Sequence, residues 1–362
     1  MNRPLHGGNL AWAAALAGCP IEQIVDFSAS INPLGPPLSA IAAIQDHLED
    51  LKAYPDPAYS SLCQALGQLH QLPMDWILPG NGSAELLTWA CRDLAALEMS
   101  FLLTPAFGDY WRALKAFNAL VKSCPLDLEQ LELGTATDLA LVLGWQSSEI
   151  AASCKGLLLN NPHNPTGQLF LKETLLTCLS QFALVVVDEA FMDFLPPEDQ
   201  QSLLAVVEDY PNLVILRSLT KFYSLPGLRL GYAIAHPQRL QRWQQWRDPW
   251  SVNVLAVAAA QAVLADQPFQ QQTWNWLKTA RRQLFQGLAQ LPSLQPYPGT
   301  ANFLLVKSQQ SVSEMQKQLL KQHQILIRDC LSFPELGDRY FRVAVRTQAE
   351  NQRLLESLAQ IL

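Results

Sequence analysis

The sequence predicts an α/β protein with a large lobe built on a mainly parallel sheet and a smaller α+β lobe beside it. Its 362 residues exceed the usual size of one domain, which favours two lobes. Short, almost continuous apolar runs recur through the middle of the chain and indicate strands that are buried on both faces of a sheet. The last third of the chain instead combines a long helical region with further strand-like runs.

The N-terminal part is predicted to be helical. Apolar spacing indicates helices over residues 38–51 and 61–70, with the proline-rich stretch AYPDPAY between them. The apolar run LAWAAALAG, just before Cys19, is similar to the cleavage region of a lipoprotein signal. Because this run is short and follows HGGN, an unusual leader sequence, we interpret it as a short amphipathic helix.

Five apolar runs form the predicted sheet of the large lobe. They are FLLTP, LALVLGW, KGLLLN, FALVVVDEAF and NLVILRS, and another strand-like run follows over residues 228–234. Residues 251–291 then have a helical pattern rich in Ala, Gln and Trp. The runs ANFLLVK, ILIRDC and YFRVAVRT predict the strands of the smaller lobe.

Composition narrows the class of protein. Apolar residues make up 49% of the chain and the net charge is −7, which argues against a disordered chain and against a general polyanion partner such as nucleic acid. No apolar run approaches the roughly 20 residues of a membrane span. The seven cysteines are scattered without CxxC spacing, which indicates reduced thiols in the cytoplasm and no metal site.

Polar clusters follow several of the apolar runs, where open parallel sheets bind their ligands. The clusters are GNGSAE, TPAFGDY, NNPHNPTG, DEAF and SLTK. GNGSAE, at residues 80–85, offers two glycines and a hydroxyl where a helix starts, which suits an anion. Glu85 stands where a dinucleotide motif has its third glycine, which counts against a dinucleotide-dependent oxidoreductase.

Asp188 and Lys221 are the candidate catalytic groups. Asp188 ends an apolar run, where a carboxylate is unfavourable unless a cation meets it, either a protonated ring nitrogen or a nearby Lys or Arg. Lys221 lies near Ser218, Thr220 and Arg229, and burial among cations lowers the pKa of a lysine and favours Schiff-base chemistry. With an anion cradle, these groups form the protein side of a pyridoxal phosphate site.

The spacing of these residues, with NPTG upstream, resembles the fold-type I superfamily of pyridoxal-phosphate-dependent aminotransferases, and the resemblance extends from GNG to RVAVR. It implies a large lobe with a mainly parallel seven-stranded sheet flanked by helices, beside a smaller α+β lobe. It also implies three regions: an N-terminal arm and part of the small domain at 1–45, a large cofactor-binding domain at 46–250, and a C-terminal small domain at 251–362.

The resemblance further implies pyridoxal 5'-phosphate as the cofactor and a homodimer with shared sites. Lys221 would bind the cofactor covalently, Asp188 would pair with its ring nitrogen, and Asn164 would bond its ring oxygen. Phe107 would stack on the ring, and Tyr54 would reach the cofactor phosphate of the neighbouring subunit. The groups assigned to the cofactor phosphate are Gly82, Ser83, Ser218, Thr220 and Arg229.

Within the superfamily, the sequence resembles two branches, the threonine-phosphate decarboxylases and the histidinol-phosphate aminotransferases. HGGN, DFSASINPLGPP, PWSVN and YPGTANF resemble the decarboxylases, and Phe191 stands where the aminotransferases usually have a tyrosine. The resemblance therefore favours decarboxylation of L-threonine O-3-phosphate to (R)-1-amino-2-propanol O-2-phosphate, a cobalamin precursor. Histidinol-phosphate amino transfer is the alternative, and a protein that binds the cofactor without turnover is a third interpretation.

Five residues are assigned to the substrate by the same resemblance. Arg342 would clamp the carboxylate, while Arg328 and His6 would grip the phosphate. Arg346 is assigned to the phosphate end, and Asn32, within DFSASINPLGPP, to the substrate as well. For each arginine, a surface salt bridge is the alternative. If Arg342 holds the carboxylate out of the cofactor plane, carbon dioxide is the group that leaves.

Overall fold

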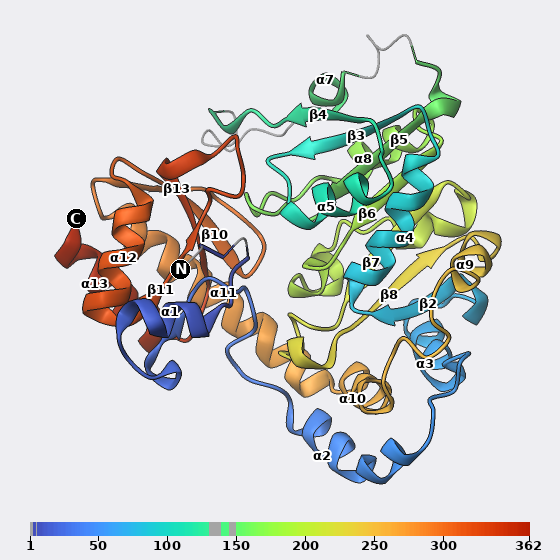
Figure 1. Ribbon diagram of the computed structural model, residues 1–362, viewed down its shortest axis with the longest axis horizontal. Coiled ribbons are helices and arrows are strands. Elements are labelled where there is room, and N and C mark those ends of the chain that lie inside the picture. Colours follow the sequence, from blue (N-terminus) through green and yellow to red (C-terminus); the bar gives the residue numbers. More distant parts are fainter. Residues whose placement is uncertain (1–2, 5, 130–138, 145–149) are drawn as a thin grey trace.

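A seven-stranded sheet forms the large lobe of the computed structural model, which describes residues 3–4, 6–129, 139–144 and 150–362 (Figure 1). In spatial order its strands are β2 (Ile77–Asn81), β8 (Leu230–Ala235), β7 (Leu213–Ser218), β6 (Leu184–Asp188), β5 (Lys155–Asn160), β3 (Met99–Thr104) and β4 (Val121–Pro125). β8 runs antiparallel to β2 and β7, and the other neighbouring pairs are parallel. The predicted mainly parallel seven-stranded sheet is confirmed.

Helices cover both faces of this sheet because successive strand side chains point to opposite sides. Val186 packs into one buried layer and Val187 into the other. On the Val186 side lie α4 (Ser83–Ala95), α5 (Gly108–Ala116) and α9 (Pro237–Gln244). On the Val187 side lie α3 (Ser60–His70), α8 (Lys172–Leu179) and α10 (Val254–Leu264).

One predicted strand of the large lobe is wrong. In the run LALVLGW, residues Leu139–Leu143 form the short helix α7. A short apolar run does not distinguish a strand from a buried helix, and Leu and Ala favour the helix. The edge of the sheet is instead β4, whose sequence VKSCP has polar side chains at two of its exposed positions. An edge strand needs only one buried face, which explains its weaker apolar signal.

The smaller lobe contains a four-stranded antiparallel sheet. Its strands, in order, are β12 (Arg328–Asp329), β13 (Tyr340–Ala344), β10 (Phe303–Ser308) and β9 (Leu294–Pro296). Its helices are α11 (Gln267–Ala289), α12 (Val312–His323) and α13 (Gln348–Ile361). The predicted α+β lobe and the strands in ANFLLVK, ILIRDC and YFRVAVRT are confirmed.

The N-terminal segment joins the smaller lobe rather than the larger one, and Figure 1 shows both chain ends there. The helix α1 (Leu10–Ala17), predicted from LAWAAALAG, packs against Leu320 of α12. The strand β1 (Val25–Asp26) pairs with β11 (Ile325–Leu326), 300 residues away in the sequence. After them, α2 (Leu38–Asp46) leads to the large lobe. The domain boundaries at residues 45 and 250 remain predictions.

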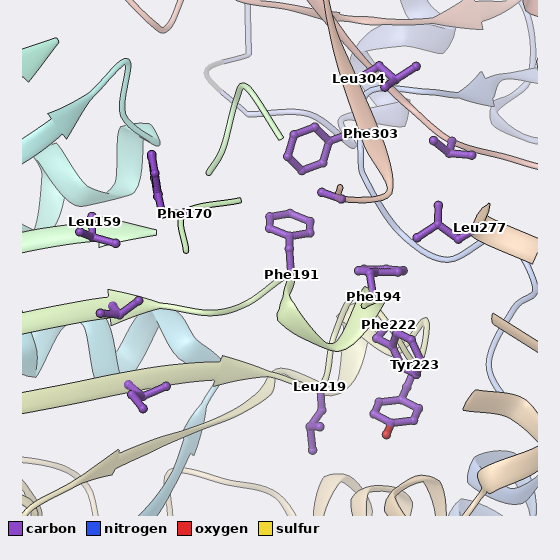
Figure 2. Close-up of a cluster of buried hydrophobic side chains, with 14 of the residues drawn as sticks. Leu159, Phe170, Phe191, Phe194, Leu219, Phe222, Tyr223, Leu277, Phe303 and Leu304 are labelled. Atoms are coloured by element: carbon purple, nitrogen blue, oxygen red, sulfur yellow. The ribbon is translucent and has the colours of Figure 1, made fainter. Parts of the chain in front are cut away.

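Buried aromatic side chains join the two lobes (Figure 2). Phe191, which follows β6, meets Phe303 of β10 edge-to-face with ring centroids 5.0 Å apart. Phe222, which follows β7, packs on Phe194 and on Trp274 of α11. Aromatic pairs of this kind stabilise a fold by about 0.5–1.5 kcal/mol each beyond their buried area. The segments after β6 and β7 are therefore fixed against the smaller lobe.

Among the helices in the described part of the chain, none has both the length and the hydropathy that crossing a membrane requires.

We expect the fold to lose stability in mild acid through His163. The ring is fully buried, and burial lowers its pKa from 6.5 to about 3. Between these two values the unfolded chain binds a proton that the folded chain does not, so the free energy of unfolding decreases as the pH falls below 6.5. His163 alone should contribute a loss of about 2 kcal/mol at pH 5.

Urea unfolding at pH 7.5 and pH 5.0 measures this loss. In His163→Asn the difference in unfolding free energy between the two pH values should shrink by about 2 kcal/mol relative to the wild type. An equal difference in both proteins would show that His163 is not the group that titrates.

Candidate active site

A cavity of about 250 Å³ lies at the carboxyl ends of β5, β6 and β7, between the two lobes. The residues around it come from segments that lie far apart in the sequence. Those predicted from the sequence are His6, Ser83, Phe107, Asn164, Asp188, Lys221, Arg328 and Arg342. The fold therefore brings together residues that are up to 336 positions apart, His6 and Arg342, at one site.

Asp188 ends β6 at the wall of this cavity. Its Oδ2 accepts a hydrogen bond from the Tyr110 hydroxyl at 2.8 Å, and its Oδ1 accepts one from the Ala190 N–H at 3.0 Å. Removal from bulk water raises the pKa of Asp188, and the positive charge of Lys221 and the two hydrogen bonds oppose that rise. The site thus keeps a carboxylate beside the cavity, and a cationic ring nitrogen there would balance its charge.

Lys221 follows β7, and its Nζ lies 3.3 Å from the Ser218 hydroxyl and 5.3 Å from the centroid of the Phe191 ring. Removal from water lowers the pKa of the Lys221 amine, the cations Arg229 and Arg342 lower it further, and Asp188 opposes them. A lowered pKa increases the neutral fraction of the amine, which is the form that attacks a carbonyl carbon.

A cradle for an anion lies at the start of α4. Gly82 has a positive φ of 75°, and a Cβ added there would lie 2.5 Å from Nη2 of Arg229. A side chain at this position would clash with the guanidinium, so glycine lets Arg229 lie beside the N-terminal N–H groups of a 13-residue helix. The hydroxyls of Ser218, which ends β7, and Thr220, in the loop after it, are 2.7 Å apart.

These features fit pyridoxal 5'-phosphate. The cradle offers cationic and N–H groups to a phosphate, Lys221 offers an amine to an aldehyde, and Asp188 offers a carboxylate to a ring nitrogen. Asn164 accepts a 2.5 Å hydrogen bond from Arg342 through Oδ1, so its amide N–H group is the part that can serve a ring oxygen. Phe191, on the same wall, has no hydroxyl for that oxygen.

Two guanidinium groups share one wall of the cavity. Arg328 of β12 and Arg342 of β13 are directly opposite each other in the antiparallel register. Like charges in this position repel, so this wall of the cavity suits anionic groups. Arg328 donates to the Ser332 hydroxyl at 2.6 Å, and Nε of Arg342 is buried without a hydrogen-bond partner in the described part of the chain. Burial lowers the pKa of Arg342 to about 10, which leaves it charged at pH 7.

The N-terminal arm closes one side of the cavity. The His6 ring lies 5.7 Å from the Phe107 ring, between centroids. Gly7 packs closely against Ser28, because a Cβ there would clash with the Ser28 carbonyl oxygen, and the Gly8 N–H donates to the Ser28 hydroxyl at 2.8 Å. Arg3 forms a 3.1 Å ion pair with Asp329, next to Arg328. The glycines of HGGN therefore let the arm pack closely over the site.

Seven sequence-predicted residues do not line the cavity. Gly82, Ser218, Thr220 and Arg229 form the cradle already described, and the other three are Arg346, Asn32 and Tyr54. Arg346 donates to the Asp26 carbonyl at 3.0 Å and to the Glu350 carboxylate at 2.7 Å, so the structure does not support its assignment to the substrate phosphate. Asn32 is buried, and its side chain donates to the Phe222 carbonyl, which supports the loop of Lys221 rather than a substrate. Tyr54 is 79% exposed on the outer face of its own chain.

The sequence reasoning missed Ser28, Tyr110 and Ser332, which line the cavity. Tyr110 had a readable signal, because it comes one helical turn after Phe107 in TPAFGDY and therefore faces the same side of α5. Ser28 and Ser332 had none, since they lie in irregular segments that are placed by long-range contacts.

Comparisons with known proteins agree with this geometry. The family model described as "Aminotransferase class I and II" matches residues 22–358. Threonine-phosphate decarboxylase from Salmonella typhimurium is 39% identical over 99% of this chain and 96% of its own. Histidinol-phosphate aminotransferase from Symbiobacterium thermophilum is 33% identical over 94% of this chain and 91% of its own. The structure of L-threonine-O-3-phosphate decarboxylase from Porphyromonas gingivalis has a TM-score of 0.82 at 24% identity, covering 93% of this chain and 99% of its own, which shows a shared fold.

Proposed function

Because the chain belongs to the class I and II aminotransferase family, we propose that it is a pyridoxal-5'-phosphate-dependent lyase that decarboxylates L-threonine O-3-phosphate. The product is (R)-1-amino-2-propanol O-2-phosphate, which is used in cobalamin biosynthesis. The observation that carries the proposal is the opposed pair Arg328 and Arg342 in the cavity of Lys221. Two guanidiniums beside a reactive amine suit an amino acid with a carboxylate at one end and a phosphate at the other.

Separate groups are assigned to the aldehyde, the ring and the phosphate of the cofactor. Lys221 would hold the aldehyde carbon covalently, Asp188 would hold the protonated ring nitrogen, and Asn164 would donate to the ring oxygen. The phosphate would be held by Gly82, Ser83, Ser218, Thr220 and Arg229. When bound, the cofactor supplies an electron sink for the pair of electrons released when a bond to the substrate Cα breaks.

The residues of the chain decide which bond to Cα breaks. Arg342 binds the substrate carboxylate and orients the bond from Cα to the carboxyl carbon. Arg328, Ser332 and His6 bind the distant phosphate, and that binding energy holds the reacting centre in position. Carbon dioxide then leaves without its bonding electrons, and a proton is added at Cα. Lys221 Nζ, which has a lowered pKa, is the group that we assign to deliver that proton.

Amino transfer is the second candidate, supported by the 33% identity to a histidinol-phosphate aminotransferase. Histidinol phosphate has no carboxylate, so that reaction would need Arg342 only for the second substrate, glutamate or its keto acid. Aminotransferases of the resembled branch usually have a tyrosine at the position of Phe191, and the phenylalanine lacks its hydroxyl. These differences, with the higher identity to a decarboxylase, favour decarboxylation.

A homodimer and a cytoplasmic location belong to the same proposal. Apolar side chains are exposed along α2 and the turn after it, including Leu38 at 86% and Leu51 at 60%. Tyr54 lies in this face with its ring 4.6 Å from that of Trp250, and it would reach the cofactor phosphate of the partner subunit. The seven cysteines are all free, as expected of a protein in a reducing compartment.

Product analysis tests the reaction. The purified protein, loaded with pyridoxal 5'-phosphate, should release carbon dioxide from L-threonine O-3-phosphate without any keto acid, and mass spectrometry should detect the amino-propanol phosphate. Glutamate formed only from histidinol phosphate and 2-oxoglutarate would make the protein an aminotransferase. If neither reaction gives a product, the remaining interpretation is a protein that binds the cofactor without turnover.

Arg328→Ala should lower kcat/KM for L-threonine O-3-phosphate by about 100-fold, because charge-assisted hydrogen bonds to the phosphate are lost. Activity on unphosphorylated L-threonine should change little, so the ratio of the two kcat/KM values is the quantity to measure. Arg346→Ala is the matched control, since Arg346 lies outside the cavity, and it should leave the ratio unchanged. A ratio altered by Arg346→Ala and not by Arg328→Ala would reverse the two assignments.

The exposed apolar side chains of α2 and of the turn after it should mediate self-association. Sedimentation velocity should give a species of twice the 40.3 kDa chain mass, and Leu51→Glu should convert it to monomers, because a charge would be buried at the interface. Leu120→Glu, at a leucine that is 65% exposed elsewhere, is the control and should remain dimeric. A monomeric wild-type protein would contradict the shared site.

A further inference from the structure

The Tyr110 side chain is part of the cavity wall behind Asp188. Tyr110 lies in the first turn of α5, is 2% exposed, and donates its hydroxyl to Asp188 Oδ2 at 2.8 Å. Its ring meets that of Phe107 edge-to-face, with centroids 5.7 Å apart. The ring packing fixes the direction of the hydroxyl, so the hydrogen bond to Asp188 is built into the fold.

This hydrogen bond determines how the Asp188 carboxylate is oriented. The two donors, the Tyr110 hydroxyl and the Ala190 N–H, each bind a different carboxylate oxygen. Together they fix the plane of the carboxylate and leave the remaining lone pairs of each oxygen for another partner. Without the Tyr110 hydroxyl, one oxygen would lose its protein donor and the carboxylate could rotate.

The hydroxyl also acts on the charge of Asp188. Removal from water raises the pKa of the carboxyl group, and the Tyr110 hydrogen bond opposes that rise, so it favours the ionised form. Burial, followed by the proximity of Asp188, raises the pKa of Tyr110 well above its ordinary value. Tyr110 therefore stays protonated and remains a donor across the physiological pH range.

We propose that Tyr110 is a positioning residue that acts through Asp188 on the ring nitrogen of the cofactor. By keeping Asp188 ionised and correctly oriented, it strengthens the binding of a ring that carries a protonated nitrogen. The inference rests on the proposed function only in taking pyridoxal 5'-phosphate as the ligand. It predicts a selective effect, confined to ligands that have this ring nitrogen.

Binding of two ligands to the full-length protein tests the inference. Equilibrium dialysis gives the Kd of pyridoxal 5'-phosphate and of its 1-deaza analogue, in which a C–H group replaces the ring nitrogen. The wild-type protein should prefer the natural ligand, and Tyr110→Phe should reduce that preference about tenfold, as expected for one hydrogen bond to a charged group. The Kd of the analogue should stay unchanged, which also shows that the variant is folded.

Two controls separate this role from a structural one. Tyr232→Phe removes another buried hydroxyl, which bonds His70 rather than Asp188, and should leave the preference unchanged. In an Asp188→Asn background, Tyr110→Phe should have no further effect on the preference, because the group through which it acts is gone.

The outcomes distinguish the two proposals. A wild-type protein that binds neither ligand would overturn the proposed function and this inference together. If the wild type prefers the natural ligand and Tyr110→Phe keeps or increases that preference, only the role of Tyr110 is overturned. Equal weakening of both ligands by Tyr110→Phe would also overturn it, since that pattern indicates a general change in the cavity.

Discussion

The site depends on one constraint, which is that Asp188 must remain a carboxylate where bulk water is largely excluded. The fold meets this requirement with groups from three separate segments. Tyr110 comes from the helix after β3, the Ala190 N–H from the turn after β6, and Lys221 from the loop after β7. Parallel strands that end at the same edge bring these segments together. A cationic ring would balance the remaining charge, so the cofactor also contributes to the stability of its own site.

The smaller lobe also brings charged groups close together at the cavity. Antiparallel pairing of β12 with β13 places Arg328 against Arg342, and like charges that face each other in this way lower the stability of a sheet. The smaller lobe must therefore be held in place by contacts elsewhere. The pairing of β1 with β11 ties the N-terminal segment to this lobe, and the contact of Phe191 with Phe303 ties the lobe to the sheet. The contacts that hold the smaller lobe in place are therefore different from the arginine pair that would bind an anion.

Features with a local signal could be predicted from the sequence, and features that depend on spatial neighbours could not. Asp188 and Lys221 each stand just after a buried apolar run, so their position at the sheet edge follows from the chain itself. The hydrogen bond of Tyr110 with Asp188 spans 78 residues and depends on where α5 packs. The run LALVLGW failed for a different reason, because five apolar residues in a row suit a strand and a buried helix equally well.

Arg346 shows where a motif alone misleads. In the alternating run YFRVAVRT, Arg342 and Arg346 would point to the same face if the strand continued, but β13 ends at Ala344. Thr347 caps α13 and forms a reciprocal capping box with Glu350, and Arg346 pairs with that same Glu350 one turn into the helix. The sequence T-x-x-E carries this signal, so a helix start could have been expected at Thr347. The charge of Arg346 is used to secure the start of a helix, whereas Arg342 lies within β13 and lines the cavity.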